Sequence, residues 1–143
     1  MTVAVMLNAK GRDVVTTTAA ASIAGAIDKL ARHKIGALVV VDDQHKIAGI
    51  ISERDIVRAI AERGAEVLST PLSDVMTRTV VTCGESETVN QVMTRMTRGR
   101  FRHMPVVESG NLAGIISIGD VVRARIEQVE REAEDMRAYI AAV

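Results

Sequence analysis

The stretch AGIISERD at residues 48–55 occurs a second time, as AGIISIGD at residues 113–120. The first five letters are identical, and Asp55 and Asp120 close the two copies. The copies are about 65 residues apart, a period typical of chains built from repeated supersecondary units. The sequence therefore predicts two similar folding units in tandem.

The segments around each copy follow one another in the same order. Each unit has a segment with apolar residues at i, i+3, i+4 and i+7, which indicates a helix with one buried face. Ser22 and Thr88 precede these helices and are plausible N-caps. Each unit then has an apolar strand, a polar turn and a second strand. The predicted elements are a short extended piece (14–16 and 80–82), a helix (22–30 and 88–96), a strand (37–41 and 104–107), an antiparallel strand (47–51 and 112–116) and a helix beginning at Ser52 or Ser117.

The fold class predicted from these elements is α+β. A unit of about 60 residues with a two- or three-stranded sheet buries too little apolar surface alone. We therefore expect the two repeats to pack sheet to sheet about a pseudo-twofold axis, which creates two equivalent clefts. The predicted boundaries are repeat 1 at 3–63, a linker at 64–73, repeat 2 at 74–125 and a C-terminal helix extension at 126–143.

The repeated motif resembles the hallmark of a known family. It reads glycine, two apolar residues, serine, two variable residues and aspartate, and Arg102-His103-Met104-Pro105-Val106 precedes the second hairpin. The chain is similar over residues 3–125 to a pair of cystathionine-β-synthase (CBS) domains, a tandem regulatory module often called a Bateman module. The resemblance implies that adenine nucleotides bind in the clefts between the repeats, without catalysis.

Two interpretations of the repeated Ser and Asp remain open. A serine at a helix start presents a hydroxyl and free backbone N–H groups to an anion, and the aspartate one turn later can accept hydrogen bonds from both hydroxyls of a ribose. Alternatively, Ser52 and Ser117 only cap helices, and Asp55 and Asp120 only favour the helix dipole.

The resemblance also implies how each cleft is assembled, because the Ser/Asp motif of one repeat faces the extended piece and first hairpin strand of the other. The expected residues of cleft 1 are Ser52, Arg54, Asp55, Val81, Thr82, Arg102, His103, Met104 and Pro105. Those of cleft 2 are Val15, Thr16, Ile35, Gly36, Ala37, Leu38, Ser117, Ile118 and Asp120.

The two expected clefts differ in charge. Cleft 1 has Arg54, Arg102 and His103, with Arg100 nearby, whereas cleft 2 has Gly119 in place of Arg54 and Ala37 in place of His103. In such modules basic residues near the hairpin hold the phosphates. We therefore expect cleft 1 to prefer a phosphorylated nucleotide, and cleft 2 to bind more weakly or to take a less negatively charged ligand.

Composition argues against several function classes. The 18 basic and 18 acidic residues balance, and Phe101 and Tyr139 are the only aromatic residues, so nucleic acid and anionic membranes are not expected partners. No apolar run is long enough to span a bilayer, and the N-terminus lacks a long apolar signal region, so we expect a cytoplasmic protein. We interpret the single cysteine, Cys83, as a small side chain and not as a nucleophile or redox sensor.

Neither a metal site nor a catalytic group is expected. His33, His45 and His103 have no Cys, His or carboxylate partners at ligand spacing, and no nucleophile and base are paired. We therefore expect a protein that is not an enzyme and has no catalytic cofactor.

The C-terminal helix carries an apolar stripe of its own. Its apolar residues recur at alternating spacings of four and three, the rhythm of a coiled-coil seam. The stripe could fold back on its own module or pair with a second chain. Because CBS modules commonly form homodimers, the resemblance favours the second reading. The stripe consists of Val122, Ile126, Val129, Ala133, Met136, Ile140 and Val143.

The sequence is compatible with two functions. In the first, the module senses AMP, ADP, ATP, NAD(H) or an S-adenosyl compound and signals to an unknown downstream effector protein. In the second, it is a ligand-independent protein–protein interaction scaffold with vestigial clefts. The intact Ser and Asp of both repeats favour sensing.

Overall fold

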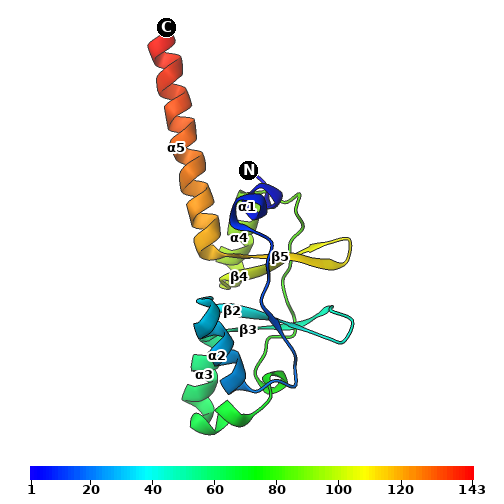
Figure 1. Ribbon diagram of the computed structural model, residues 1–143. Coiled ribbons are helices and arrows are strands. Elements are labelled where there is room, and N and C mark those ends of the chain that lie inside the picture. The colour runs from blue at the N-terminus through cyan, green and yellow to red at the C-terminus, as the bar shows by residue number, and fades with distance from the viewer. The chain divides into compact units, whose positions relative to one another are not determined.

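The computed structural model describes residues 1–143, and the order helix, strand, strand, helix occurs twice in it (Figure 1). This confirms the α+β class and the elements predicted for each repeat. The elements in chain order are α1 (Val3–Lys10), β1 (Thr16–Thr17), α2 (Ile23–His33), β2 (Ala37–Val41), β3 (Ile47–Ser52), α3 (Glu53–Arg63), the 3₁₀ helices η1 (Ala65–Ser69) and η2 (Leu72–Asp74), α4 (Val89–Gly99), β4 (His103–Glu108), β5 (Asn111–Ser117) and α5 (Ile118–Ala142).

The chain forms two units. Unit 1 contains residues 1–12, 82–108 and 114–143, and unit 2 contains residues 13–81 and 109–113. The N-terminal segment therefore belongs to the unit that contains the second repeat, although it precedes the first repeat in the sequence. The predicted packing of the two repeats on each other, and the predicted repeat boundaries, stay predictions.

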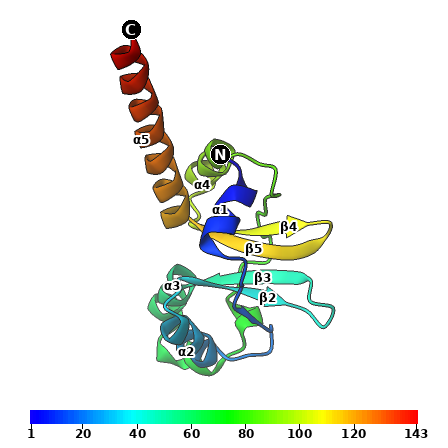
Figure 2. The same cartoon turned by 45° about the horizontal axis from the view of Figure 1, so that its top comes forward.

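Unit 2 is built on the sheet β1-β2-β3. The short β1 pairs in parallel with β2, and β2 pairs antiparallel with β3, with Leu38 opposite Ile51. All five residues of β2 are buried, as its apolar run predicts. Helices α2 and α3 lie on the same face of the β2–β3 hairpin (Figure 2). Ile23, Ala26 and Leu30 of α2 are buried in the core beneath that sheet.

The predicted linker contributes to the core of unit 2. Val67 of η1 and Leu72 of η2 are 1% and 0% exposed, and both belong to the buried cluster around β2. Beyond η2, Thr77 exchanges two backbone hydrogen bonds of 2.9 Å with Ile50, so this segment extends the sheet at β3. A Cβ added at Gly49 would lie 2.8 Å from the carbonyl oxygen of Thr77. Only glycine therefore permits this close approach.

Unit 1 repeats the plan around the hairpin of β4 and β5. Residues 82–84 take the place of β1, because Cys83 forms a parallel bridge with Val106. Helix α1 packs against the hairpin through Leu7, which is fully buried. A Cβ at Gly114 would lie 2.8 Å from the Cδ2 atom of Leu7. Gly114 thus corresponds to Gly49, and in each unit a glycine of the second hairpin strand admits the segment that packs on it.

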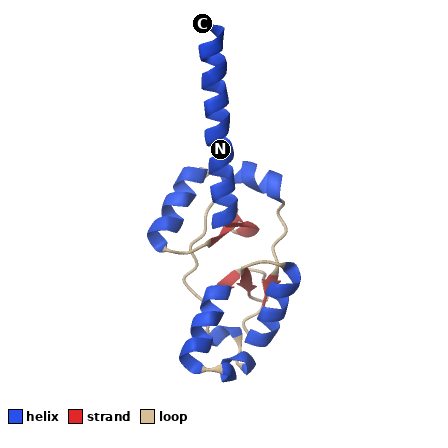
Figure 3. Ribbon diagram, turned by 90° about the vertical axis from the view of Figure 1, so that its left-hand side faces the viewer, coloured by secondary structure: helices blue, strands red, loops and turns tan.

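Helix α5 is a continuous helix of 25 residues. Its buried residues, Val121 and Ala124, lie in its first two turns. The rest extends beyond the other elements of unit 1, as Figure 3 shows. The apolar stripe stays exposed from Val122, which is 45% exposed, to Val143, which is 95% exposed. The stripe therefore does not fold back on its own unit.

Candidate functional site

The first Ser/Asp motif lies where β3 passes into α3. Ser52 is the N-cap of α3 with an extended backbone, and its Oγ accepts a hydrogen bond of 3.2 Å from the N–H of Asp55. In return, Oδ2 of Asp55 accepts from the N–H of Ser52 at 3.0 Å. This reciprocal pair is a capping box, which fixes the carboxylate beside the helix start.

The second motif has the same geometry where β5 passes into α5. The N–H of Ser117 donates to Oδ2 of Asp120 at 2.8 Å, and the N–H of Asp120 donates to Oγ of Ser117 at 3.2 Å. The capping role left open by the sequence is thus present in both repeats. Because it uses one carboxylate oxygen of each aspartate, it leaves Oδ1 for other partners.

A third bond ties each motif to the first strand of its own hairpin. The N–H of Glu53 donates to the carbonyl of Gly36 at 3.0 Å, and the N–H of Ile118 donates to the carbonyl of Arg102 at 2.8 Å. In the first turns of α3 and α5 this leaves the N–H groups of Arg54 and Gly119 without an acceptor in their own units. One backbone donor therefore remains for an anion at each helix start.

The predicted cleft residues divide between the two units. Unit 2 brings one Ser/Asp motif together with the first hairpin strand of repeat 1, where Ala37 pairs with Ser52. Unit 1 does the same for Ser117 and His103–Pro105. The combination of a motif with residues of the other unit therefore stays a prediction. The residues in unit 2 are Val15, Thr16, Ile35, Gly36, Ala37, Leu38, Ser52, Arg54, Asp55 and Val81, and those in unit 1 are Thr82, Arg102, His103, Met104, Pro105, Ser117, Ile118 and Asp120.

Side-chain burial separates these residues by what they can offer a ligand. Leu38 and Met104 are fully buried, so their side chains serve the core. Arg54 and Arg102 are exposed, and neither forms an ion pair within its own unit. These two guanidinium groups are therefore available to a phosphate.

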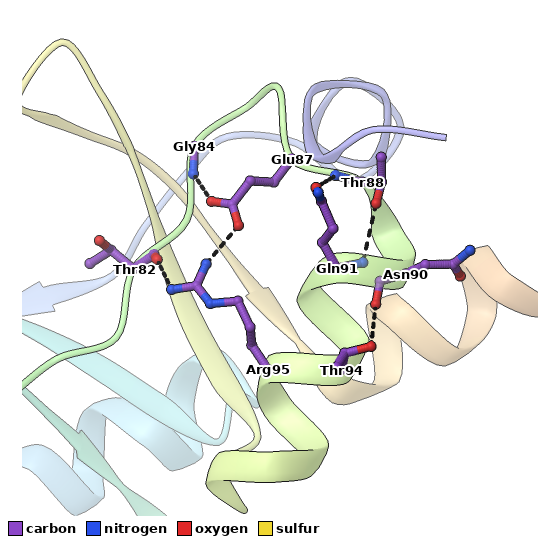
Figure 4. Close-up of polar contacts among 8 residues, drawn as sticks. All are labelled: Thr82, Gly84, Glu87, Thr88, Asn90, Gln91, Thr94 and Arg95. Atoms are coloured by element: carbon purple, nitrogen blue, oxygen red, sulfur yellow. Dashed lines mark hydrogen bonds and ion pairs between the residues drawn. The ribbon is translucent and has the colours of Figure 1, made fainter.

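An ion pair that the sequence did not reveal holds the segment around Thr82 (Figure 4). Arg95 of α4 donates to the carbonyl of Thr82 at 2.7 Å and to Oε1 of Glu87 at 2.6 Å. Oε2 of Glu87 accepts from the N–H of Gly84 at 2.7 Å. The network fixes the backbone of a predicted cleft residue. Glu87 precedes the start of α4 and lies eight residues before Arg95. The sequence therefore contains no i, i+3 or i, i+4 pair that would predict this ion pair.

Cys83 lies within this segment and is 3% exposed. Burial, together with the charge of Glu87, raises the pKa of its thiol to about 12, although Arg95 lowers it in part. A thiol with so high a pKa is a weak nucleophile at neutral pH. The environment of Cys83 thus agrees with its reading as a small side chain.

The two aspartates differ in their counter-ions. Lys10 of α1 forms an ion pair with Oδ2 of Asp120 and donates to the carbonyl of Ile115 at 2.7 Å. Burial raises the pKa of Asp120, but hydrogen bonds from Lys10 and Ser117 and the charge of Lys10 together hold the pKa below its ordinary value. Within its own unit, no basic side chain is paired with Asp55. The first aspartate therefore has no counter-ion in its unit, whereas the second has one.

A groove of about 380 Å³ lies beside the second motif in unit 1. Its walls come from α1 and α5, and they include Lys10, Asp120 and Arg123. Arg123 lies 3.6 Å from Oδ1 of Asp120, which adds a second positive charge near that carboxylate.

No helix of the structure is both long and apolar enough to cross a membrane.

Comparison with protein families matches two segments of this chain, one for each repeat. The family description "CBS domain" matches residues 10–62 and 72–127. A mitochondrial CBS domain-containing protein of Arabidopsis thaliana, CBSX3, is 40% identical over 119 residues, which are 80% of this chain. The chain spans 58% of the length of that relative.

This chain also aligns with most of the length of several solved structures. The CBS-domain containing protein ATU1752 from Agrobacterium tumefaciens is 52% identical with a TM-score of 0.86, over 87% of this chain and 99% of that one. The CBS domain pair of protein MJ0100, in complex with 5′-methylthioadenosine and S-adenosyl-L-methionine, is 29% identical with a TM-score of 0.80, over 90% and 98%. CBS domain protein PAE2072 from Pyrobaculum aerophilum, complexed with AMP, is 28% identical with a TM-score of 0.75, over 84% and 89%.

Proposed function

The chain belongs to the CBS domain family, and on that premise we propose that it is a regulatory, non-catalytic module that binds an adenosine-containing ligand. The ligands of the two similar complexes, AMP in one and 5′-methylthioadenosine with S-adenosyl-L-methionine in the other, share an adenosine group. The candidate ligands for this chain are AMP, ADP, ATP, NAD(H) and S-adenosyl compounds, all of which contain that group.

The observation that supports this proposal most is the state of Asp55. The capping box orients its carboxylate without using Oδ1, and no cation of its own unit neutralises it. A fixed, unpaired carboxylate is a suitable acceptor for two ribose hydroxyls. Arg54, exposed on the same helix start, supplies positive charge for a phosphate. We propose that cleft 1 is the stronger site, formed by Ser52, Arg54, Asp55, Val81, Thr82, Arg102, His103, Met104 and Pro105.

We propose that cleft 2 binds more weakly. A ribose at Asp120 would compete with the ammonium group of Lys10 for the same carboxylate. Gly119 stands where repeat 1 has Arg54, so this helix start offers a phosphate a backbone N–H but no guanidinium. The residues proposed for it are Val15, Thr16, Ile35, Gly36, Ala37, Leu38, Ser117, Ile118 and Asp120.

Isothermal titration calorimetry tests the sensor function. Nucleotide-free protein is titrated with AMP, ATP, NAD⁺, NADH and S-adenosylmethionine, and the same titrations are run with Asp55→Asn. An asparagine oxygen can still accept from the N–H of Ser52, so the cap survives while the charge is lost. We expect saturable binding that Asp55→Asn weakens at least tenfold. Asp28→Asn, on the exposed face of α2, is the control and should leave binding unchanged.

The alternative function gives a different result. If no ligand produces heat or a thermal shift, the sensor function is wrong and the ligand-independent scaffold with vestigial clefts is the better account. If binding is lost with Asp120→Asn but kept with Asp55→Asn, the assignment of the stronger cleft is wrong.

We further propose that the module acts in the cytoplasm as a homodimer with a downstream effector protein. A single buried cysteine fits a reducing compartment. The exposed apolar stripe of α5 needs a partner surface. Ligand binding would then change how repeats or chains pack, which is the signal that an effector reads.

A further inference from the structure

The projecting part of α5 exposes a continuous apolar seam. The seam spans residues 122–143, about three heptads of helix. Ile126 is 52% exposed, Met136 is 59% exposed and Ile140 is 66% exposed, although all three are large apolar side chains. Apolar surface on this scale, with a 4-3 spacing and no cover within its own unit, is typical of a helix that pairs with another helix.

The spacing assigns heptad positions along α5. Ile126, Ala133 and Ile140 take position a, whereas Val122, Val129, Met136 and Val143 take position d. Isoleucine at two of the three a positions is typical of two-stranded parallel coils, whereas valine and methionine, not leucine, occupy the d positions, so it is the flanking charges that decide for a parallel pair. The charged residues that flank the seam are Arg125 and Glu132 at position g, and Arg123, Glu130 and Arg137 at position e.

These flanking charges discriminate between the two orientations. In a parallel pair, a g residue faces the e residue five positions later on the other helix. This places Arg125 opposite Glu130 of the second copy, and Glu132 opposite Arg137 of the second copy, so every such pair has opposite charges. An antiparallel pair can form in two registers, in which e faces e and g faces g. If Ile126 faces Met136, Glu130 meets Glu130, Glu132 meets Glu132 and Arg123 meets Arg137, so like charges repel. If Ile126 faces Val143, Glu130 meets Arg137 but Glu132 meets Tyr139, so fewer opposite charges are paired than in the parallel coil.

We propose that α5 forms a parallel, two-stranded coiled coil with α5 of a second copy of this chain, through residues 122–143. This deepens the proposed homodimer by naming its interface and orientation, and it does not depend on ligand binding. Because the seam begins two residues after Asp120, the parallel orientation brings the second Ser/Asp motifs of both copies to the same end of the coil. The interface is isologous, as a twofold homodimer requires.

The oligomeric state tests the interface. Sedimentation equilibrium of the full chain is compared with that of the double variant Ile126→Asp and Ile140→Asp, and with the control Ala138→Asp. Ala138 is an exposed residue of the same helix at position f, opposite the seam. We expect the unmodified chain and the control to be dimers, and the seam variant to weaken dimerisation at least 100-fold. A monomeric or trimeric unmodified chain, or a seam variant that still dimerises fully, would overturn the proposal.

A disulfide cross-link tests the orientation. In the parallel coil, Val122→Cys places two cysteines face to face at one d layer, within reach of a disulfide. In an antiparallel coil residue 122 faces residue 140 or lies beyond the end of the partner's seam, so the two cysteines are at least about 27 Å apart. Native Cys83 is buried and does not compete. We expect mild oxidation to cross-link the variant nearly completely; a dimer that does not cross-link would overturn the parallel orientation.

A charge exchange provides a second measure of orientation that leaves the seam intact. Glu132→Arg should weaken the parallel dimer several-fold, because the introduced arginine then faces Arg137 of the second copy, and adding Arg137→Glu should restore it. In the antiparallel coil, Glu132→Arg replaces one like-charged pair with another or faces Tyr139, depending on the register, so an unchanged affinity would overturn the parallel orientation. Nucleotide titration of the same variants keeps this test separate from the sensor function, since loss of either property leaves the other measurable.

Discussion

Replacing Lys10 with methionine should destabilise the protein in a pH-dependent way. The lysine ties α1 to the second Ser/Asp motif through Asp120 and through the carbonyl of Ile115. Methionine keeps the apolar stem of the side chain and removes only the charged donor. The variant therefore isolates the two hydrogen bonds and the ion pair.

The magnitude follows from the burial of the pair. The side chain of Lys10 is 31% exposed and that of Asp120 is 13% exposed, so the pair lies between a surface ion pair and a buried one. Surface pairs contribute up to about 1 kcal/mol, and hydrogen bonds to charged groups contribute about 1.5–3 kcal/mol. We expect Lys10→Met to lower the free energy of unfolding at pH 7 by about 1.5 kcal/mol. For a chain of this length that corresponds to about 5 °C in Tm.

The pH dependence has a definite sign. Because the pKa of Asp120 in the folded protein lies below its ordinary value of 3.8, the stabilisation is present at neutral pH and is lost as the pH falls through the folded pKa. The difference between the variant and the unmodified protein should therefore be largest at pH 7 and shrink below about pH 4.

Urea denaturation at pH 7, 5 and 3, followed by circular dichroism, makes the measurement. The matched control is Arg32→Met, which removes the ion pair between Arg32 and Asp28, whose side chains are 71% and 62% exposed. Its expected cost is about 0.3 kcal/mol. Equal effects of the two variants, or a Lys10→Met effect that is the same at pH 3 as at pH 7, would refute the assigned role of Lys10.

Three further predictions concern packing and the buried thiol. Gly49→Ala and Gly114→Ala should each lower the free energy of unfolding by about 1–3 kcal/mol, because the added Cβ overlaps a neighbouring atom. Gly84→Ala, which has no neighbour closer than 4.0 Å, should change the free energy of unfolding little. Urea denaturation of the three variants makes the comparison. Cys83 should resist Ellman's reagent in the native protein at pH 8 and react only after unfolding. Arg95→Met should destabilise the protein by about 1–2 kcal/mol and speed this reaction, since it frees the segment that contains the thiol; an unchanged rate would contradict that role.

The sequence predicts local structure well because each repeat carries its own strong signals. The apolar period of residues 22–30, the continuous apolar run of residues 37–41 and the N-cap Ser52 are local features, and each forms the expected element. Burial and capping act over a few residues, so they can be recognised without knowledge of distant contacts. The Ser/Asp motifs were found for the same reason.

The contacts that distinguish the two motifs depend on residues far apart in the chain. Lys10 and Asp120 are brought together only when α1 packs on the hairpin of the second repeat, and no periodicity relates them. The same is true of Leu7 against Gly114. The sequence therefore predicts two nearly equal aspartates, apart from the charge of Arg54, whereas within its own unit only Asp120 has a counter-ion.

The placement of α1 in unit 1, and of residues 72–81 in unit 2, changes what counts as one repeat. The segment that opens each repeat in the sequence completes the core of the unit that holds the other repeat. A fragment cut at the boundary of a sequence repeat would therefore lack the segment that covers its own core. It would retain instead the segment that covers the core of the other unit. Residues 13–81 include the complete partner of Gly49, namely Met76 and Thr77, and form the natural fragment for expression. Deleting either repeat at its sequence boundary would therefore also remove the segment that covers the core of the other.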